Sequence, residues 1–156
     1  GDTVLASPAS ADEILKLGNQ LCFPLYAAAN LITRLYRPAL DRLGLTYPQY
    51  LVMLVLWEKA PQSVSDLGAC LYLDSGTLTP LLKRMESAKL ITRTRDAEDE
   101  RRVQIALTSK GRKLKQDAYA IPAQICGAMG LPLDELIALR GTMQKLLGAL
   151  ARVRTY

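Results

Sequence analysis

Long apolar stripes at helical spacing stand at both ends of the chain. Residues 11–43 keep apolar side chains at intervals of three and four, which predicts an amphipathic helix. Pro24 and Pro38 interrupt that stripe, so a kink or a break is expected near each of them. Residues 109–128 are predicted to form a further helix, and residues 133–153 carry a second broad apolar face.

The first of three shorter helices in the middle of the chain is predicted to be buried. Gly44 is placed to end the preceding helix. Thr46 and Gln49 then have the spacing of a capping box, in which each side chain bonds the other residue's backbone N–H. Residues 50–57 are apolar on all sides, and a helix without a polar face is typically buried.

Two short helices with a tight connection follow, which is the pattern of a helix-turn-helix. Ser63 and Asp66 lie in the first turn of a helix that is expected to reach about Leu71. Asp74 or Ser75 is expected to cap the next helix, which extends to about residue 88. Residues 63–88 are therefore the predicted helix-turn-helix.

The periodicity then changes from helix to strand. Residues 90–95 and 103–108 alternate as strands do, and the charged stretch 96–102 lies between them as a hairpin tip. Thr108 is expected to cap the helix that follows. We predict a mainly α fold with a small β wing at 89–108: a winged helix-turn-helix with six helices, in a single domain over residues 1–156.

The second helix of such a unit enters the major groove of DNA, and its N-terminal residues meet base edges. Ser75, Thr77 and Thr79 are small hydrogen-bonding residues at that end. Lys83 and Arg84 lie further along, where contacts to phosphate set the register without reading sequence.

The wing tip carries Arg101 and Arg102, and an arginine on a thin hairpin can enter a minor groove. Asp99 is expected to hold one of these arginines by an ion pair. The other acidic residues of the tip are expected to lie in solvent, because they would repel phosphate.

Composition limits the other functions that the chain could have. The formal net charge of +5 favours a polyanionic partner such as double-stranded DNA. The absence of histidine excludes histidine-based metal sites and histidine general-base catalysis, and the three cysteines have no zinc spacing. We therefore expect no enzyme, no metal and no cofactor. Without a membrane span or a signal peptide, a cytoplasmic protein is expected.

The stretch from residue 67 to residue 108 resembles the MarR family of bacterial regulators. The resemblance rests on Asp74-Ser-Gly-Thr-Leu-Thr-Pro-Leu-Leu-Lys-Arg-Met-Glu86, on Leu90-Ile-Thr-Arg93 and on the Asp-x-Arg wing signature at Asp99 and Arg101. It implies a homodimer built by helices at 11–45 and 109–156, with residues 46–108 as the DNA-binding region. A dimer makes a palindromic operator the natural target.

The segment around Cys22 is similar to the organic-hydroperoxide-sensing branch of that family, called OhrR. The resemblance implies that Cys22 is the peroxide-reactive thiol, that Tyr36 and Tyr47 hydrogen-bond it, and that Tyr26 lines the same pocket. Tyr36 follows Cys22 by 14 residues, or about 21 Å along one straight helix. The tyrosines should then come from the partner subunit, unless the helix breaks sharply at Pro24.

Oxidation of Cys22 would give a sulfenic acid that can condense with a second thiol. The resemblance to two-cysteine members favours Cys126 as that thiol, in an intersubunit disulfide. Cys70 is interpreted as a small buried hydrophobic residue of the helix-turn-helix.

The sequence thus predicts a DNA-binding regulator that releases operator DNA when organic hydroperoxides oxidise Cys22. The resemblance implies that this regulator is a repressor, because repression is the usual mode of the family. The main alternative is a regulator of the same fold that a non-covalent small-molecule ligand releases. A thiol peroxidase and an architectural DNA-binding protein without a switch are further rivals.

Overall fold

The structure, a computed structural model, describes residues 11–153 and confirms a mainly helical fold with a small β wing. The chain divides into two compact units at the bond between Tyr50 and Leu51, inside helix α4. Whether the whole chain acts as the single domain expected from the sequence stays a prediction.

The helix predicted over 11–43 is divided in the structure. Its parts are α2 (Ala11–Ile14), the 3-10 turn η1 (Leu17–Asn19) and α3 (Phe23–Leu43). Pro24 stands in the first turn of α3, where the missing N–H costs nothing, so the break expected there is present. No break occurs at Pro38, which lies inside the continuous helix. Gly44 ends α3 in the left-handed conformation, with φ of +69°.

Helix α4 (Tyr47–Glu58) begins with the predicted capping box. The Gln49 N–H donates to Thr46 Oγ1 at 3.3 Å, and the Thr46 N–H donates to Gln49 Oε1 at 3.0 Å. Three of its apolar side chains are buried almost completely: Val52, Met53 and Leu56. Leu54 is 41% exposed, so the helix is buried on most sides but not on all.

The predicted helix-turn-helix consists of α5 (Val64–Leu71) and α6 (Ser75–Ser87). Ser63 caps α5 by accepting the Asp66 N–H at 3.0 Å. Asp74 caps α6 by accepting the Thr77 N–H at 2.8 Å, which decides between the two residues proposed for that cap. The buried face of α6 fixes it to the core through Leu78, Leu81, Leu82 and Met85.

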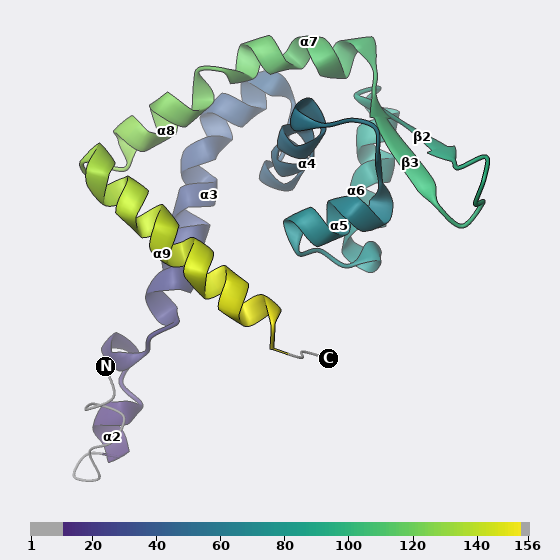
Figure 1. Cartoon of the computed structure of the whole chain (residues 1–156). Helices are drawn as coiled ribbons and strands as arrows, with labels where there is room; N and C mark the ends of the chain where they lie inside the picture. Colours follow the sequence, from purple (N-terminus) through teal and green to yellow (C-terminus); the bar gives the residue numbers. More distant parts are fainter. Residues whose placement is uncertain (1–10, 154–156) are drawn as a thin grey trace. The chain divides into compact units, whose positions relative to one another are not determined.

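The wing is a three-stranded antiparallel sheet in the order β1-β3-β2, where two strands were expected. Strands β2 (Ile91–Arg95) and β3 (Val103–Leu107) form the hairpin that projects beside the two helices in Figure 1. Strand β1 (Gln62–Ser63) adds to the other edge of β3. Two residues are too short a run to show an alternating pattern, so β1 could not be predicted from the sequence.

The helix predicted over 109–128 is also divided, into α7 (Ser109–Ala118) and α8 (Ile121–Ala128). The cause is Pro122, which takes a first-turn position and so begins a new helix. Thr108 caps α7 as predicted, accepting the Gly111 N–H at 3.0 Å. Helix α9 (Leu133–Ala151) ends the described part of the chain.

Lys89 occupies a backbone conformation that favours glycine. It follows α6 with φ of +63°, in the left-handed region, where an L residue is disfavoured by about 1 kcal/mol relative to glycine. We expect Lys89→Gly to raise the free energy of unfolding by about 1 kcal/mol, measured by denaturant unfolding at fixed protein concentration. Ala88→Gly is the control, because φ of Ala88 is −78° and glycine brings no relief there. Equal gains for both variants would contradict the strain at Lys89.

Candidate functional site

The exposed side of α6 carries the residues proposed to contact DNA. Ser75 and Thr77 are exposed in its first turn, and Thr79 is half-buried. Lys83 and Arg84 are exposed two turns later, on a helix whose opposite side is packed into the core. The structure therefore presents hydrogen-bonding groups at the N-terminal end of α6 and cations further along it.

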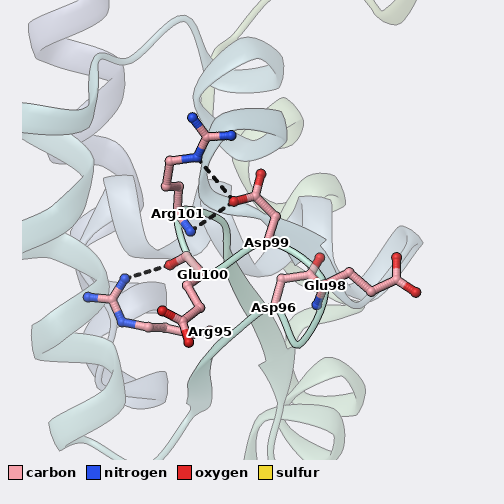
Figure 2. Close-up of polar contacts among 6 residues, drawn as sticks. All are labelled: Arg95, Asp96, Glu98, Asp99, Glu100 and Arg101. Atoms are coloured by element: carbon pink, nitrogen blue, oxygen red, sulfur yellow. Dashed lines mark hydrogen bonds and ion pairs between the residues drawn. The ribbon is translucent and has the colours of Figure 1, made fainter.

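The wing tip holds Arg101 by the predicted pairing with Asp99. Figure 2 shows that one carboxylate oxygen, Oδ1 of Asp99, accepts both the Arg101 backbone N–H at 3.1 Å and its Nε–H at 3.2 Å. Arg95 closes the hairpin from the other side by donating to the Glu100 carbonyl at 2.7 Å. The Arg101 side chain is still 92% exposed, so its guanidinium extends into solvent from a fixed base.

Arg102 lies differently from Arg101. Its Nη2 is 3.9 Å from Oδ2 of Asp66, so the side chain turns toward the first turn of α5. The prediction that Asp96 lies free in solvent was wrong. It accepts the Glu98 N–H at 2.9 Å and a hydrogen bond from Gln104 Nε2 at 3.4 Å, because a hairpin turn needs an acceptor for its backbone N–H groups.

Cys22 is the residue directly before α3, and it is exposed. Its carbonyl accepts the Tyr26 N–H at 3.1 Å, so Cys22 is fixed in the first turn of the helix. Helix α3 continues without a break from Phe23 to Leu43. Tyr36 of the same chain is therefore about 21 Å from Cys22 along the helix, beyond the reach of a hydrogen bond.

Three tyrosines in the first unit form a compact cluster. The ring centroids of Tyr36 and Tyr47 are 4.9 Å apart, and those of Tyr36 and Tyr50 are 5.7 Å apart. The third pair, Tyr47 and Tyr50, is separated by 6.3 Å. Burial raises the pKa of Tyr47, and it also raises the pKa of Tyr50 with a smaller contribution from the charge of Tyr47.

Tyr50 was missed from the sequence, although it is only 3% exposed and stands in the cluster. Its spacing of three residues from Tyr47, on one side of α4, was the available signal. Tyr26 is 69% exposed, and so it presents its ring to the surroundings of the isolated chain.

The other two cysteines lie in the second unit. Cys126 is half-buried near the end of α8. The prediction that Cys70 is buried was wrong, because it is exposed on α5. The inward side of α5 follows the helical spacing of Val64, Leu67 and Leu71, and position 70 lies off that stripe.

An open groove of about 900 Å³ lies in the second unit between the helix-turn-helix and the end of α9. Asp74 and Ser75, at the start of α6, form part of its wall, and Leu147 and Leu150 of α9 form another part. Within residues 11–153 no three His, Cys, Asp or Glu side chains gather where they could hold a metal ion. No helix in the same range has an apolar stretch long enough to span a membrane.

Residues 34–118 match the protein family described as transcriptional regulator SarA/Rot. The organic hydroperoxide resistance transcriptional regulator of Bacillus subtilis (strain 168) is 51% identical over 136 residues, which are 87% of this chain and 92% of that protein. This similarity extends over most of both chains, including the helix-turn-helix and the wing.

AbfR of Staphylococcus epidermidis is similar in structure and has been solved in several states. Reduced AbfR bound to DNA is 38% identical, with a TM-score of 0.71 over 87% of this chain and 95% of that chain. Overoxidized AbfR bound to DNA is 37% identical, with a TM-score of 0.69 over 85% and 94%. Disulfide-formed AbfR is 38% identical, with a TM-score of 0.60 over 84% and 92%. These likenesses confirm the winged helix-turn-helix fold.

The tyrosine cluster predicts a loss of stability at alkaline pH. A phenol whose pKa is raised on folding stabilises the protein below its unfolded-state pKa of about 10 and loses that effect as the pH rises through the folded-state pKa. We expect Tyr47→Phe to flatten the fall in the free energy of unfolding above pH 10, because phenylalanine has no proton to lose. Denaturant unfolding between pH 8 and about 11 measures this effect. Tyr119→Phe, at an exposed tyrosine, should behave as the wild type.

Proposed function

This chain belongs to the MarR and SarA family of winged helix-turn-helix transcriptional regulators, which are not enzymes, and on that basis we propose that it is a repressor that senses organic hydroperoxides through Cys22. Oxidation of Cys22 would release a palindromic operator. The observation that carries the proposal is an exposed Cys22 at the first turn of α3, in a chain 51% identical to an organic hydroperoxide resistance regulator. As a DNA-binding regulator it is proposed to act in the cytoplasm.

The proposed contacts to DNA divide by position. Ser75, Thr77 and Thr79 would meet base edges in the major groove, and Lys83 with Arg84 would contact phosphates. The exposure of Ser75 and Thr77 in the first turn of α6, and of Lys83 and Arg84 two turns later, supports this division. The hairpin tip would follow the minor groove, with Arg101 oriented by Asp99 and Arg102 beside it.

The sensing chemistry is proposed to use two thiols and no cofactor. The Cys22 thiolate attacks one peroxide oxygen, the O–O bond breaks, and the products are a cysteine sulfenic acid and an alkoxide that takes a proton from water to give the alcohol. The Cys126 thiol then displaces water from that sulfenic acid and leaves an intersubunit disulfide. AbfR has been solved on DNA in reduced and overoxidized forms and separately in a disulfide form, which supports the disulfide as the releasing step.

The thiol pocket is proposed to contain residues of two chains. Because α3 runs unbroken, Tyr36 cannot bond Cys22 of its own chain, and the ring of Tyr47 packs against that of Tyr36 in a tilted arrangement. We infer that the partner's cluster supplies the hydroxyl groups that stabilise the thiolate. Tyr26, one helical turn after Cys22, would line the same pocket.

A homodimer is supported by the apolar side chains that the isolated chain leaves exposed. A monomeric protein rarely exposes so many large apolar side chains. They lie before α3, in its first half and along α9, the regions predicted to dimerise: Leu15, Leu17, Leu21, Phe23, Leu31, Leu133, Ile137, Leu139, Leu147 and Leu150.

The alternative of release by a non-covalent ligand is favoured by one observation, the groove beside α6. A groove of about 900 Å³ is large enough for a small molecule, and such a molecule would contact Asp74 and Ser75 at the base-reading end of α6. In that case Cys22 would have no part in induction.

The redox proposal is tested by DNA binding with and without an organic hydroperoxide. Cumene hydroperoxide should release the wild type from a duplex selected by the reduced protein, and Cys22→Ser should stay bound. Cys126→Ser should form the sulfenic acid without an intersubunit disulfide, and its release should be much weaker. Anisotropy and non-reducing electrophoresis measure the two effects.

Cys70→Ser is the matched control, because it removes another exposed thiol. It should respond to hydroperoxide as the wild type does. If Cys22→Ser were released as readily as the wild type, the sensing role of Cys22 would be wrong, while DNA binding would stand.

The phosphate contacts predict a change in salt dependence. Each phosphate contact contributes about 0.9 to the slope of log affinity against log salt. Lys83→Ala should therefore lower the magnitude of that slope by about 1 per protomer bound, and it should weaken all duplexes alike. Lys145→Ala, an exposed lysine on α9, should leave the slope unchanged. Equal slopes for Lys83→Ala and the wild type would show that Lys83 does not contact a phosphate.

A further inference from the structure

Segments that are far apart in the sequence meet where the wing joins α7, all within the second unit. We call this place the junction; it comprises Trp57 of α4, the segment 88–90 after α6, Thr108, Lys110 and Gly111. Its side-chain hydrogen bonds all join a side chain to backbone, so that they hold the course of the chain itself. The junction lies at the opposite end of α6 from the residues proposed to read bases.

Thr108 is bonded to both sides of the junction. Its Oγ1 lies 2.6 Å from the Lys89 carbonyl oxygen and 3.0 Å from that of Leu90, and it accepts the Gly111 N–H at 3.0 Å. The Thr108 N–H also donates to the Leu90 carbonyl at 3.1 Å. One residue thus joins the chain leaving α6 to the first turn of α7.

Two further contacts fix the same turn of α7. The indole Nε1–H of Trp57, the single tryptophan of the chain, donates to the Gly111 carbonyl at 2.9 Å. Lys110 Nζ donates to the Ala88 carbonyl at 3.0 Å. At Gly111 a Cβ would stand 2.2 Å from the Leu90 carbonyl oxygen, so the two backbones touch and only glycine fits between them.

We propose that Thr108 and Trp57 are positioning residues for DNA recognition: they hold the recognition helix α6 in a fixed orientation against α7. The inference rests on the proposed use of α6 to read DNA. Base-edge hydrogen bonds tolerate little displacement, and a supporting contact that is loose by about 1 Å is enough to spoil a binding site. Contacts to phosphate tolerate a displacement of about 1 Å, because they depend mainly on charge. Loosening the junction should therefore reduce specific binding and spare non-specific binding.

The test compares two changes at Thr108, of which one is isosteric and the other keeps the hydroxyl. Thr108→Val removes the hydroxyl and keeps the shape, and Thr108→Ser keeps the hydroxyl. We expect Thr108→Val to lower the ratio of specific to non-specific affinity about tenfold, the effect of one impaired base contact. Thr108→Ser should stay within about twofold of the wild type, since it can form the same hydrogen bonds. The probes are a duplex selected from a random pool by the wild-type protein and an unrelated duplex of equal length.

Thr46→Val is the control for a lost helix cap, because Thr46 caps α4 by the same kind of bond. It should lose a similar amount of thermal stability and keep the wild-type affinity ratio, when each variant is measured at a temperature where it is fully folded. Trp57→Phe should lower the ratio of specific to non-specific affinity, as Thr108→Val does. Tyr119→Phe should keep the wild-type ratio.

An unchanged ratio in both Thr108→Val and Trp57→Phe, with only stability reduced, would show that the junction is purely structural and would overturn the proposal. A wild-type protein that selects no duplex would contradict DNA reading by α6 itself. The two failures are therefore distinguishable.

Discussion

The rise of an unbroken α-helix is the constraint on which the proposed mechanism depends. Helix α3 runs from Phe23 to Leu43 without interruption, and so it holds Cys22 about 21 Å away from Tyr36 of the same chain. Under that constraint Tyr36 of the same chain cannot hydrogen-bond the thiol, and a bond from this tyrosine would have to come from a second copy of the chain. The exposed apolar side chains near the start of α3 and along α9 give the chain a physical reason to associate with a second copy. Chemistry at Cys22 would then act directly on the contact between two DNA-binding units.

The DNA-binding region is held together differently at its two ends. The N-terminal end of α6, which is proposed to read bases, is capped by Asp74, and Ser75 and Thr77 in its first turn stay exposed. Its other end is tied to the wing and to α7 by hydrogen bonds from Thr108 and by the close approach of Gly111 to Leu90. This asymmetry suits the proposed role of α6, because the side chains that would meet DNA remain available while the backbone that carries them is fixed.

Local chemistry explains why so much of the fold could be predicted from the sequence. Caps at Thr46, Ser63 and Thr108 are contacts over three residues, and the strands of the wing hairpin follow from alternation, so both could be predicted without knowing the tertiary structure. Of the breaks expected at Pro24 and Pro38, only the first is present, and the division at Pro122 was missed, because a proline permits either a kink or a new start and only packing decides which. The exposure of Cys70, the two-residue strand β1 and the place of Tyr50 in the tyrosine cluster depend on tertiary contacts, which no local pattern contains.

The acidic hairpin tip has a consequence for how the protein moves through a genome. Residues 96–102 combine four carboxylates with two guanidinium groups, and Asp99 binds the more exposed of the two arginines. Random DNA attracts proteins almost wholly through its phosphates. A hairpin tip with excess negative charge would add little to that attraction and would shorten each chance encounter. Such a protein would spend less time trapped at wrong sites, and it would keep its strongest hold for sequences whose narrow groove draws Arg101 inward.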